Sequence, residues 1–178
     1  VINDSERSIT TIVDIVNKQL PPNIKRINHF EETEIGVLIS CDFGIAQFNL
    51  QTLQFGDTYF IGAANPEISV KQTTTFNGEI YAATVEGIKK AVITNPNLID
   101  AQQWQNVQSG NFDAVVAFED LLYIGLANGQ VLRSSNGTSF QNFTQLSPNL
   151  IDLRSANGNL IAVSETTVRI YNEAAALI

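Results

Sequence analysis

Few side chains in this chain could carry out acid–base or nucleophilic chemistry, since its 178 residues include one histidine, His29, and one cysteine, Cys41. A histidine that acts as a general base needs a nucleophile or an orienting carboxylate, and no Gly-x-Ser-x-Gly motif supplies the nucleophile. One histidine and one cysteine are too few for a zinc site. We therefore predict no catalytic, cofactor-binding or metal-binding residues. His29 is interpreted as a strand residue bonded to the backbone, and Cys41 as a small buried apolar residue.

The carboxylates are numerous but scattered along the chain. The run Glu31-Glu32-Thr33-Glu34 is interpreted as a solvent-exposed hairpin tip, and Glu119-Asp120 occupies the corresponding place in a later repeat. A glycosidase needs two carboxylates about 5–10 Å apart across a cleft, and no spacing in the sequence marks such a pair. The sequence therefore favours a protein that is not an enzyme.

The composition limits the partners. The net charge of −8 repels phosphate backbones and anionic lipid surfaces, so we expect neither nucleic-acid nor membrane-surface binding. No apolar run approaches the ~18 residues of a membrane span, so no membrane insertion is expected. A single cysteine excludes an internal disulfide. Because the chain starts at Val1 in the middle of a pattern, we expect it to be part of a longer protein.

The strongest signal is an internal repeat of about forty residues. Each copy has an apolar strand, a turn and another strand, and in three copies a glycine precedes that second strand. Gly44 and Gly87 are 43 residues apart, Gly87 and Gly129 are 42 apart, and Thr167 follows 38 residues later in the fourth copy. A period near forty with several strands in each unit is typical of a β-propeller.

Turn residues support several hairpins in each repeat. The dipeptide Asn-Gly occurs at 77–78, 128–129, 136–137 and 157–158, each time between β-rich runs. A type I′ hairpin turn needs positive φ at both central residues, which Asn-Gly tolerates well. We therefore predict a type I′ turn at each of these dipeptides.

The predicted fold is all-β, with about four propeller blades that are four-stranded antiparallel sheets and form an arc of a larger propeller. The blades are predicted to cover residues 25–62, 67–108, 112–146 and 150–178. Trp104 and its analogues Tyr59 and Phe140 are expected to pack between neighbouring blades rather than to bind a ligand. The fourth blade ends before a comparable strand is complete. An arc leaves a blade face unpartnered, through which the chain could self-associate.

Residues 1–24 are predicted to be the remnant of a preceding blade. The apolar residues between Ile9 and Leu20 have helical spacing. The β-branched residues Thr10-Thr11-Ile12-Val13 favour a strand instead. We predict a strand over residues 8–20, ended by Pro21-Pro22.

The first two predicted blades resemble a known family, the N-terminal propeller of PorZ-type proteins of the Bacteroidetes. More loosely, the repeat is similar to that of two-component-regulator propellers. The segments that carry the resemblance are Asp42-Phe43-Gly44-Ile45, Asp57-Thr58-Tyr59-Phe60-Ile61-Gly62, residues 81–91, Asn95-Pro96-Asn97-Leu98 and Trp104.

The resemblance implies a periplasmic, outer-membrane-surface or secreted protein of the type IX secretion system that acts through interactions. No catalytic residue carries over from the family. The predicted function is thus a non-catalytic interaction or scaffold module with a protein or surface-glycan partner that the sequence does not identify. Two alternatives stay open: the ligand-sensing propeller of a two-component regulator, and a polysaccharide-active propeller enzyme.

Overall fold

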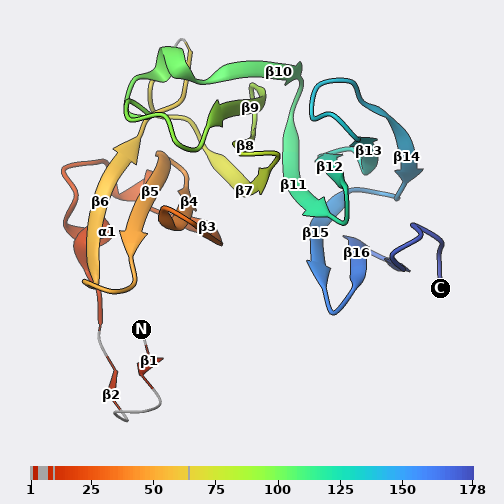
Figure 1. Cartoon of the computed structure of the whole chain (residues 1–178), viewed down its shortest axis with the longest axis horizontal. Helices are drawn as coiled ribbons and strands as arrows, with labels where there is room; N and C mark the ends of the chain where they lie inside the picture. Colours follow the sequence, from red (N-terminus) through yellow and green to blue (C-terminus); the bar gives the residue numbers. More distant parts are fainter. Residues whose placement is uncertain (1, 4–7, 10, 64) are drawn as a thin grey trace.

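The computed structural model of the chain is an arc of four antiparallel sheets (Figure 1). It describes residues 2–3, 8–9, 11–63 and 65–178. The prediction of an all-β propeller fold with about four blades is confirmed. The predicted blade ranges include the loops that connect the strands as well as the strands themselves. These ranges remain a prediction of the domain limits.

Consecutive strands pair in order within each sheet, which we call blades 1 to 4. Blades 1 to 3 have four strands and blade 4 has three. Blade 1 contains β3 (Ile27–Thr33), β4 (Gly36–Cys41), β5 (Gly44–Asn49) and β6 (Gln54–Tyr59). Blade 2 contains β7 (Val70–Phe76), β8 (Glu79–Thr84), β9 (Gly87–Val92) and β10 (Gln105–Ser109). Blade 3 contains β11 (Phe112–Phe118), β12 (Leu121–Leu126), β13 (Gln130–Ser134) and β14 (Gln141–Gln145), and blade 4 contains β15 (Leu150–Ala156), β16 (Asn159–Ser164) and β17 (Val168–Tyr171).

The first strand of each blade is the innermost. Strand β7 contacts both β3 and β11, and β11 also contacts β15, so these four strands line the inner side of the arc. Each innermost strand has a register shift near its start, which leaves one residue without a partner on the second strand. The four unpaired residues are Asn28, Lys71, Asp113 and Ile151. The bulge is therefore a repeated feature of the blade.

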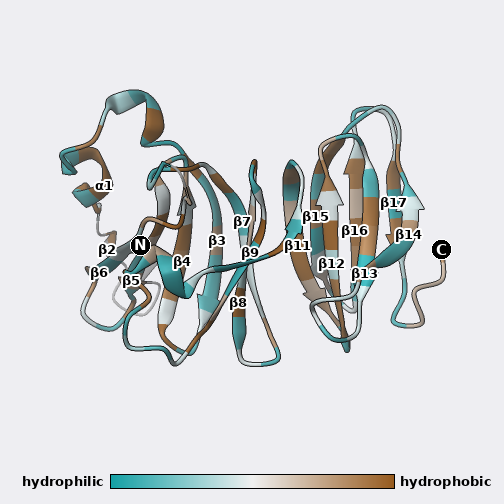
Figure 2. Ribbon diagram, turned by 90° about the horizontal axis from the view of Figure 1, so that it is seen from above, coloured by the Kyte–Doolittle hydropathy of each residue, from teal (hydrophilic) through white to brown (hydrophobic). Residues whose placement is uncertain are grey.

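Figure 2 shows hydrophobic residues on the strands of every blade, and apolar side chains pack in clusters between neighbouring blades. One cluster joins Leu38 and Ile45 of blade 1 to Ile80 and Trp104 of blade 2. Corresponding clusters lie between blades 2 and 3 and between blades 3 and 4. A single blade has two apolar faces, so the stack of blades rather than each sheet alone forms the core.

The Asn-Gly turns fall into two classes. Asn77-Gly78 and Asn157-Gly158 have positive φ at both residues, as a type I′ turn requires, and each joins the first strand of a blade to the second. At Asn128-Gly129 and Asn136-Gly137 only the glycine has positive φ. The prediction of four type I′ turns is therefore wrong for two of them, although all four join strands.

The glycine that begins the third strand is explained by the fourth strand beside it. A Cβ atom on Gly44 would collide with the carbonyl oxygen of Tyr59, and one on Gly87 with that of Gln108. Blade 4 has no strand beside the start of β17, and Thr167 occupies the corresponding place. The repeat thus loses its glycine where the steric reason for it is missing.

Of the predicted strand over residues 8–20, only Ser8–Ile9 is a strand among the described residues, and the prediction is wrong for residues 11–20. Residues Asp14–Asn17 form the short helix α1, followed by the 3-10 helix η1 (Pro22–Ile24). A second 3-10 helix, η2 (Ala101–Gln103), lies in blade 2, and the two-residue strands β1 (Ile2–Asn3) and β2 (Ser8–Ile9) pair with each other. Ile12, Ile15, Leu20 and Ile24 pack onto blade 1. Here burial of the apolar stripe against a sheet outweighs the β-propensity of the branched residues.

Candidate functional site

His29 lies on the innermost strand β3, as predicted, near the axis of the arc. Its Nδ1 atom is buried and has no hydrogen-bond partner among the described residues, so the predicted backbone bond to that atom is wrong. Burial lowers the pKa of His29, the Asp152 carboxylate opposes this shift, and the Arg154 guanidinium adds to it. Burial thus favours the neutral form of His29, and the charged side chains that affect its pKa lie on β15.

Glu31 joins blade 1 to blade 2. Its carboxylate accepts a hydrogen bond from the Thr74 hydroxyl at 3.1 Å, and Thr74 Oγ1 in turn accepts one from the backbone N–H of Ala117 at 3.3 Å. Burial raises the pKa of Glu31, while hydrogen bonds from Thr74 and from the backbone of Thr75 act in the opposite direction. The prediction of a solvated tip is wrong for this half-buried residue.

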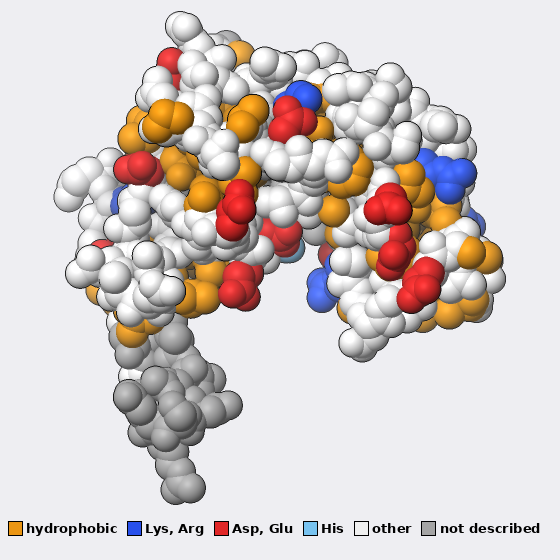
Figure 3. Space-filling model, viewed as in Figure 1, with side chains coloured by type: hydrophobic (Ala, Val, Ile, Leu, Met, Phe, Trp, Pro, Cys, Tyr) orange, Lys and Arg blue, Asp and Glu red, His pale blue; other side chains and the backbone are white. Residues whose placement is uncertain are grey.

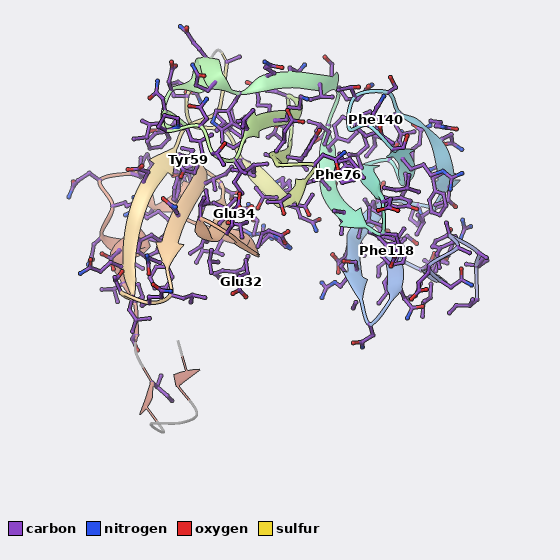
Figure 4. All side chains as sticks on the ribbon, in the orientation of Figure 1. Glu32, Glu34, Tyr59, Phe76, Phe118 and Phe140 are labelled. Atoms are coloured by element: carbon purple, nitrogen blue, oxygen red, sulfur yellow. The ribbon has the colours of Figure 1, made fainter. Side chains whose placement is uncertain are left out.

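The other acids of that run do reach solvent. Glu32 and Glu34 are exposed, and their side chains lie toward the open side of the arc (Figure 4). On β15, Asp152 forms an ion pair with Arg154. Figure 3 shows that acidic side chains outnumber basic ones on this face. Of these acids, only Glu31 bonds to another blade, whereas Asp152 pairs within its own strand.

Cys41 has the environment of a structural residue. The side chain is fully buried on blade 1, where its thiol lies 3.6 Å from the carbonyl oxygen of Ile39. Burial raises the pKa of the Cys41 thiol to about 12, with a further contribution from the Asp42 carboxylate. A thiol that stays protonated is a poor nucleophile, so the interpretation as a buried apolar residue is confirmed.

Trp104 packs between blades, as predicted. It is 6% exposed, its ring centroid lies 6.2 Å from that of Tyr59 on blade 1, and its indole N–H donates to the carbonyl oxygen of Leu98 at 2.9 Å. Phe140, at the analogous position in blade 3, packs against the cluster between blades 2 and 3 (Figure 4).

A large concave surface lies on blade 1, on the face turned away from blade 2. We call it the end groove; it encloses about 660 Å³ between the sheet and the segment around α1. Its lining is apolar apart from Thr11 and Lys25. Five of its apolar residues are exposed, among them Ile27 at 42% and Phe30 at 59%; the others are Ile9, Val16 and Leu50. A surface of this kind suits a protein or other apolar partner rather than bond-breaking chemistry.

Blade 4 has a second open apolar face, on the side turned away from blade 3. We call it the end face, and its residues are Ile161, Val163, Val168 and Ile170. Burial alternates along β16 and β17, so the neighbours Leu160, Ala162 and Tyr171 are buried against blade 3 while these four are not.

The sequence analysis predicted an unpartnered blade face but assigned no residues to it. Ile27, Phe30 and Val168 have the same apolar character as residues that other blades bury completely. Nothing in a single sequence separates them from core positions. The one available signal was the prediction of an arc, which leaves two end faces without a neighbour.

The four consecutive antiparallel blades, three of them four-stranded and one three-stranded, define a β-propeller arc with open apolar surfaces at its two ends. The family model described as the PorZ N-terminal β-propeller domain of the type IX secretion system matches residues 2–105. The chain therefore belongs to the PorZ N-terminal propeller family.

Solved structures show the same fold. PorZ of Porphyromonas gingivalis, described as an essential surface component of the type IX secretion system, has a TM-score of 0.70 at 16% identity; the match covers 86% of this chain and 20% of PorZ. The extracellular domain of a proposed hybrid two-component system of B. thetaiotaomicron has a TM-score of 0.63 at 17% identity, covering 86% of this chain and 23% of that one. The chain thus spans about a fifth of the length of these proteins.

Designed proteins share the arc as well. The computationally designed Ika4 protein has a TM-score of 0.59 at 11% identity, with 83% of this chain and 91% of the designed chain covered. The comparison with curated proteins gives no match. No helix in the described part of the chain is long and apolar enough to cross a membrane.

Proposed function

We propose that this chain is a non-catalytic interaction module of an extracytoplasmic protein of the type IX secretion system, and that the end groove is its contact surface. The observation that carries the proposal is the apolar groove of about 660 Å³ on a regular sheet face. Membership of the PorZ family supports the link to secretion. The similarity to a bacterial surface component and to an extracellular domain supports a location outside the cytoplasm.

The chemistry of the inner strands supports a non-catalytic role. Glu31 and Asp152 are engaged with Thr74 and Arg154, and the Cys41 thiol is buried and protonated. A histidine acts as a general base only when a nucleophile or an orienting carboxylate lies in hydrogen-bond reach, and His29 Nδ1 has no hydrogen-bond partner among the described residues. Polysaccharide turnover by the chain that is lost on replacement of His29 would contradict the proposal.

The test uses the full-length protein in the organism that carries the gene. Phe30→Asp places a charge in the end groove at a side chain that is 59% exposed. We expect secretion of type IX cargo to fall about tenfold or more, as for loss of a central interface residue, while the amount of the protein stays constant. Ile99→Asp is the matched control, because Ile99 is 54% exposed and lies outside the groove. Normal secretion by Phe30→Asp would refute the proposal.

The sensor function is the second candidate, favoured by the structural similarity to the extracellular domain of a two-component system. The same two variants separate the candidates. A sensor predicts that Phe30→Asp changes transcription of a set of target genes and leaves cargo secretion unchanged. A secretion component predicts the reverse.

A further inference from the structure

The four Asn-Gly dipeptides place the same two residues in different surroundings. In such a pair the backbone nitrogen of the glycine can attack the side-chain amide carbon of the asparagine, because glycine has no side chain to hinder the approach. This reaction makes asparagine a thermolabile residue. All four asparagines are exposed, but the glycines differ. Gly78 and Gly158 are exposed, whereas Gly129 and Gly137 are buried.

Hydrogen bonds hold both reacting groups at Asn128-Gly129. The N–H of Gly129 donates to the carbonyl oxygen of Leu126 at 3.0 Å. The side-chain oxygen of Asn128 accepts a hydrogen bond from the backbone N–H of Gln130 at 3.0 Å. The glycine nitrogen and the amide carbon can therefore meet only after the turn opens locally.

Asn136-Gly137 is held in the same way. The N–H of Gly137 donates to the hydroxyl oxygen of Ser134 at 2.9 Å. The side-chain oxygen of Asn136 accepts hydrogen bonds from the backbone N–H groups of Thr138 at 3.0 Å and Ser139 at 2.9 Å. Both turns that have a buried glycine thus keep the two reacting groups occupied.

The two turns that have an exposed glycine lack these restraints. Among the described residues, neither the Asn77 side chain nor the N–H of Gly78 has a hydrogen-bond partner. In the same part of the chain, neither the Asn157 side chain nor the N–H of Gly158 has one. No atom lies within 4 Å of a Cβ added to Gly78, and at Gly158 the nearest is a carboxylate oxygen of Glu173 at 3.4 Å. Rotation within these turns therefore breaks no hydrogen bond of the reacting groups.

We propose that Asn77 and Asn157 deamidate spontaneously in the folded protein, and that the fold protects Asn128 and Asn136. The glycine nitrogen forms a bond to the asparagine Cγ and gives its proton to a solvent base, while the bond between Cγ and Nδ2 breaks and the amide leaves as ammonia. Water then opens the cyclic imide at either of its two carbonyl groups. One product is aspartate on the normal backbone, and the other is isoaspartate, whose backbone passes through the side-chain carbon.

Each product adds a negative charge to a turn that already has a carboxylate beside it. Glu34 lines the same hollow of about 260 Å³ as Gly78, and Glu173 lies next to Gly158. Isoaspartate also adds one carbon to the backbone of a two-residue turn whose geometry matches the twist of its strands. In blade 2 this displaces the carbonyl oxygen of Gly78 that accepts from the N–H of Ile93 at 3.1 Å.

The experiment incubates the purified 178-residue chain for several weeks at mildly alkaline pH, folded and, in a parallel sample, unfolded in guanidinium chloride. Trypsin places the four dipeptides on four different peptides, which are residues 72–89, 91–133, 134–154 and 155–169. Mass spectrometry measures the conversion of amide to acid, and labelling by isoaspartyl methyltransferase identifies isoaspartate. In the folded chain we expect the two exposed turns to react about tenfold or more faster than the two protected turns, where two hydrogen bonds must break first. In the unfolded chain the four rates should be similar.

Ser134→Ala tests the cause of the protection. It removes the acceptor of the Gly137 N–H, so Asn136 should react several times faster than in the parent chain. Ser164→Ala is the matched control, because its hydroxyl accepts from the N–H of Thr167 at 3.1 Å in a turn without Asn-Gly, and Asn136 should stay protected. Circular dichroism shows whether each variant is folded, and if Ser134→Ala is not, the comparison within the parent chain decides alone.

Several results would overturn the inference. In the folded chain these are similar rates at the four turns, faster reaction at Asn128 or Asn136, and an unreacted Asn77 or Asn157. The same order of rates in guanidinium chloride would also overturn it, because the sequence rather than the fold would then set the rates. So would a folded Ser134→Ala chain in which Asn136 reacts as slowly as before.

Discussion

The position of Glu31 on the innermost strand of blade 1 changes the burial and the pKa of its carboxyl group. Its sequence neighbours Glu32 and Glu34 are exposed, whereas Glu31 lies against blade 2 and receives a hydrogen bond from Thr74. Burial raises the pKa of Glu31 above the ordinary value of 4.5. The folded state therefore binds a proton more tightly than the unfolded state.

This shift gives the first prediction at the residue scale, for Glu31→Gln. A carboxyl group with a raised pKa favours folding when it is protonated, so this contribution is lost as the pH rises through the unfolded and then the folded pKa. The amide keeps a hydrogen-bond acceptor for Thr74 and cannot ionise. We expect the stability of the variant relative to the parent to increase between pH 4 and pH 7. Urea titrations at several pH values measure it.

Glu34→Gln is the control for that experiment. It removes one negative charge at an exposed turn position of the same hairpin. An equal gain in both variants would show that net charge, rather than burial of Glu31, causes the effect.

At the scale of the strand, the fourth strand of a blade determines the residue that begins the third. Gly87 has φ of +148°, and a Cβ atom there would meet the carbonyl oxygen of Gln108. Thr167, beside no fourth strand, carries a Cβ atom without such a collision. The glycines thus recur in the sequence because a fourth strand lies beside the start of the third strand in blades 1 to 3.

Gly87→Ala is predicted to destabilise the chain by about 2–4 kcal/mol, because backbone strain and overpacking add. Gly78→Ala is the matched control: its φ of +74° also disfavours alanine, but no atom lies within 4 Å of the added Cβ. We expect it to cost about 1 kcal/mol. Urea unfolding measures both, and equal losses would show that contact with the fourth strand is unimportant.

The strands were largely predictable because their signals are local. Gly44, Gly87 and the Asn-Gly dipeptides mark turns through backbone geometry, which sequence reports directly. The bulges at Asn28 and the equivalent residues have no such signal, since the extra residue can be of any type. The segment around Ile15 was misread because its fold depends on packing against blade 1 rather than on local propensity.

At the scale of the whole molecule, stability depends on contacts between blades. Leu150 of β15 packs against Gly125 of β12, and Gln72 of β7 donates a hydrogen bond to the carbonyl oxygen of Leu153 at 3.1 Å. Blade 2 is therefore linked to blade 4 as well as to its neighbours. We expect the arc to unfold as one cooperative unit.

Leu150→Ala tests this coupling at a distance. The substitution leaves a cavity between blades 3 and 4 and should cost about 2–5 kcal/mol. Trp104, between blades 1 and 2, reports on the other end of the arc through its fluorescence. For a cooperative unit, the midpoints by fluorescence and by far-ultraviolet circular dichroism shift together. A fluorescence midpoint that stays at the parent value would show that the blades unfold separately.

The residues of the candidate site were less predictable than the fold because their exposure depends on the arrangement of the whole stack of blades. Phe30 and Val168 are exposed only because no blade lies next to them, whereas Val115 and Val131 at equivalent positions are fully buried. Exposure at the ends of a stack is a property of the stack's length. The residues themselves do not encode it.

The repeated bulge makes the inner surface of the arc chemically adjustable. Asn28, Lys71, Asp113 and Ile151 stand at one structural position in four blades, yet they are an amide, a cation, an acid and an aliphatic group. Strand pairing does not constrain their identity. Four single substitutions could thus tune the electrostatic potential along the axis while the hydrogen-bond ladders stay intact, which gives related sequences room to diverge there.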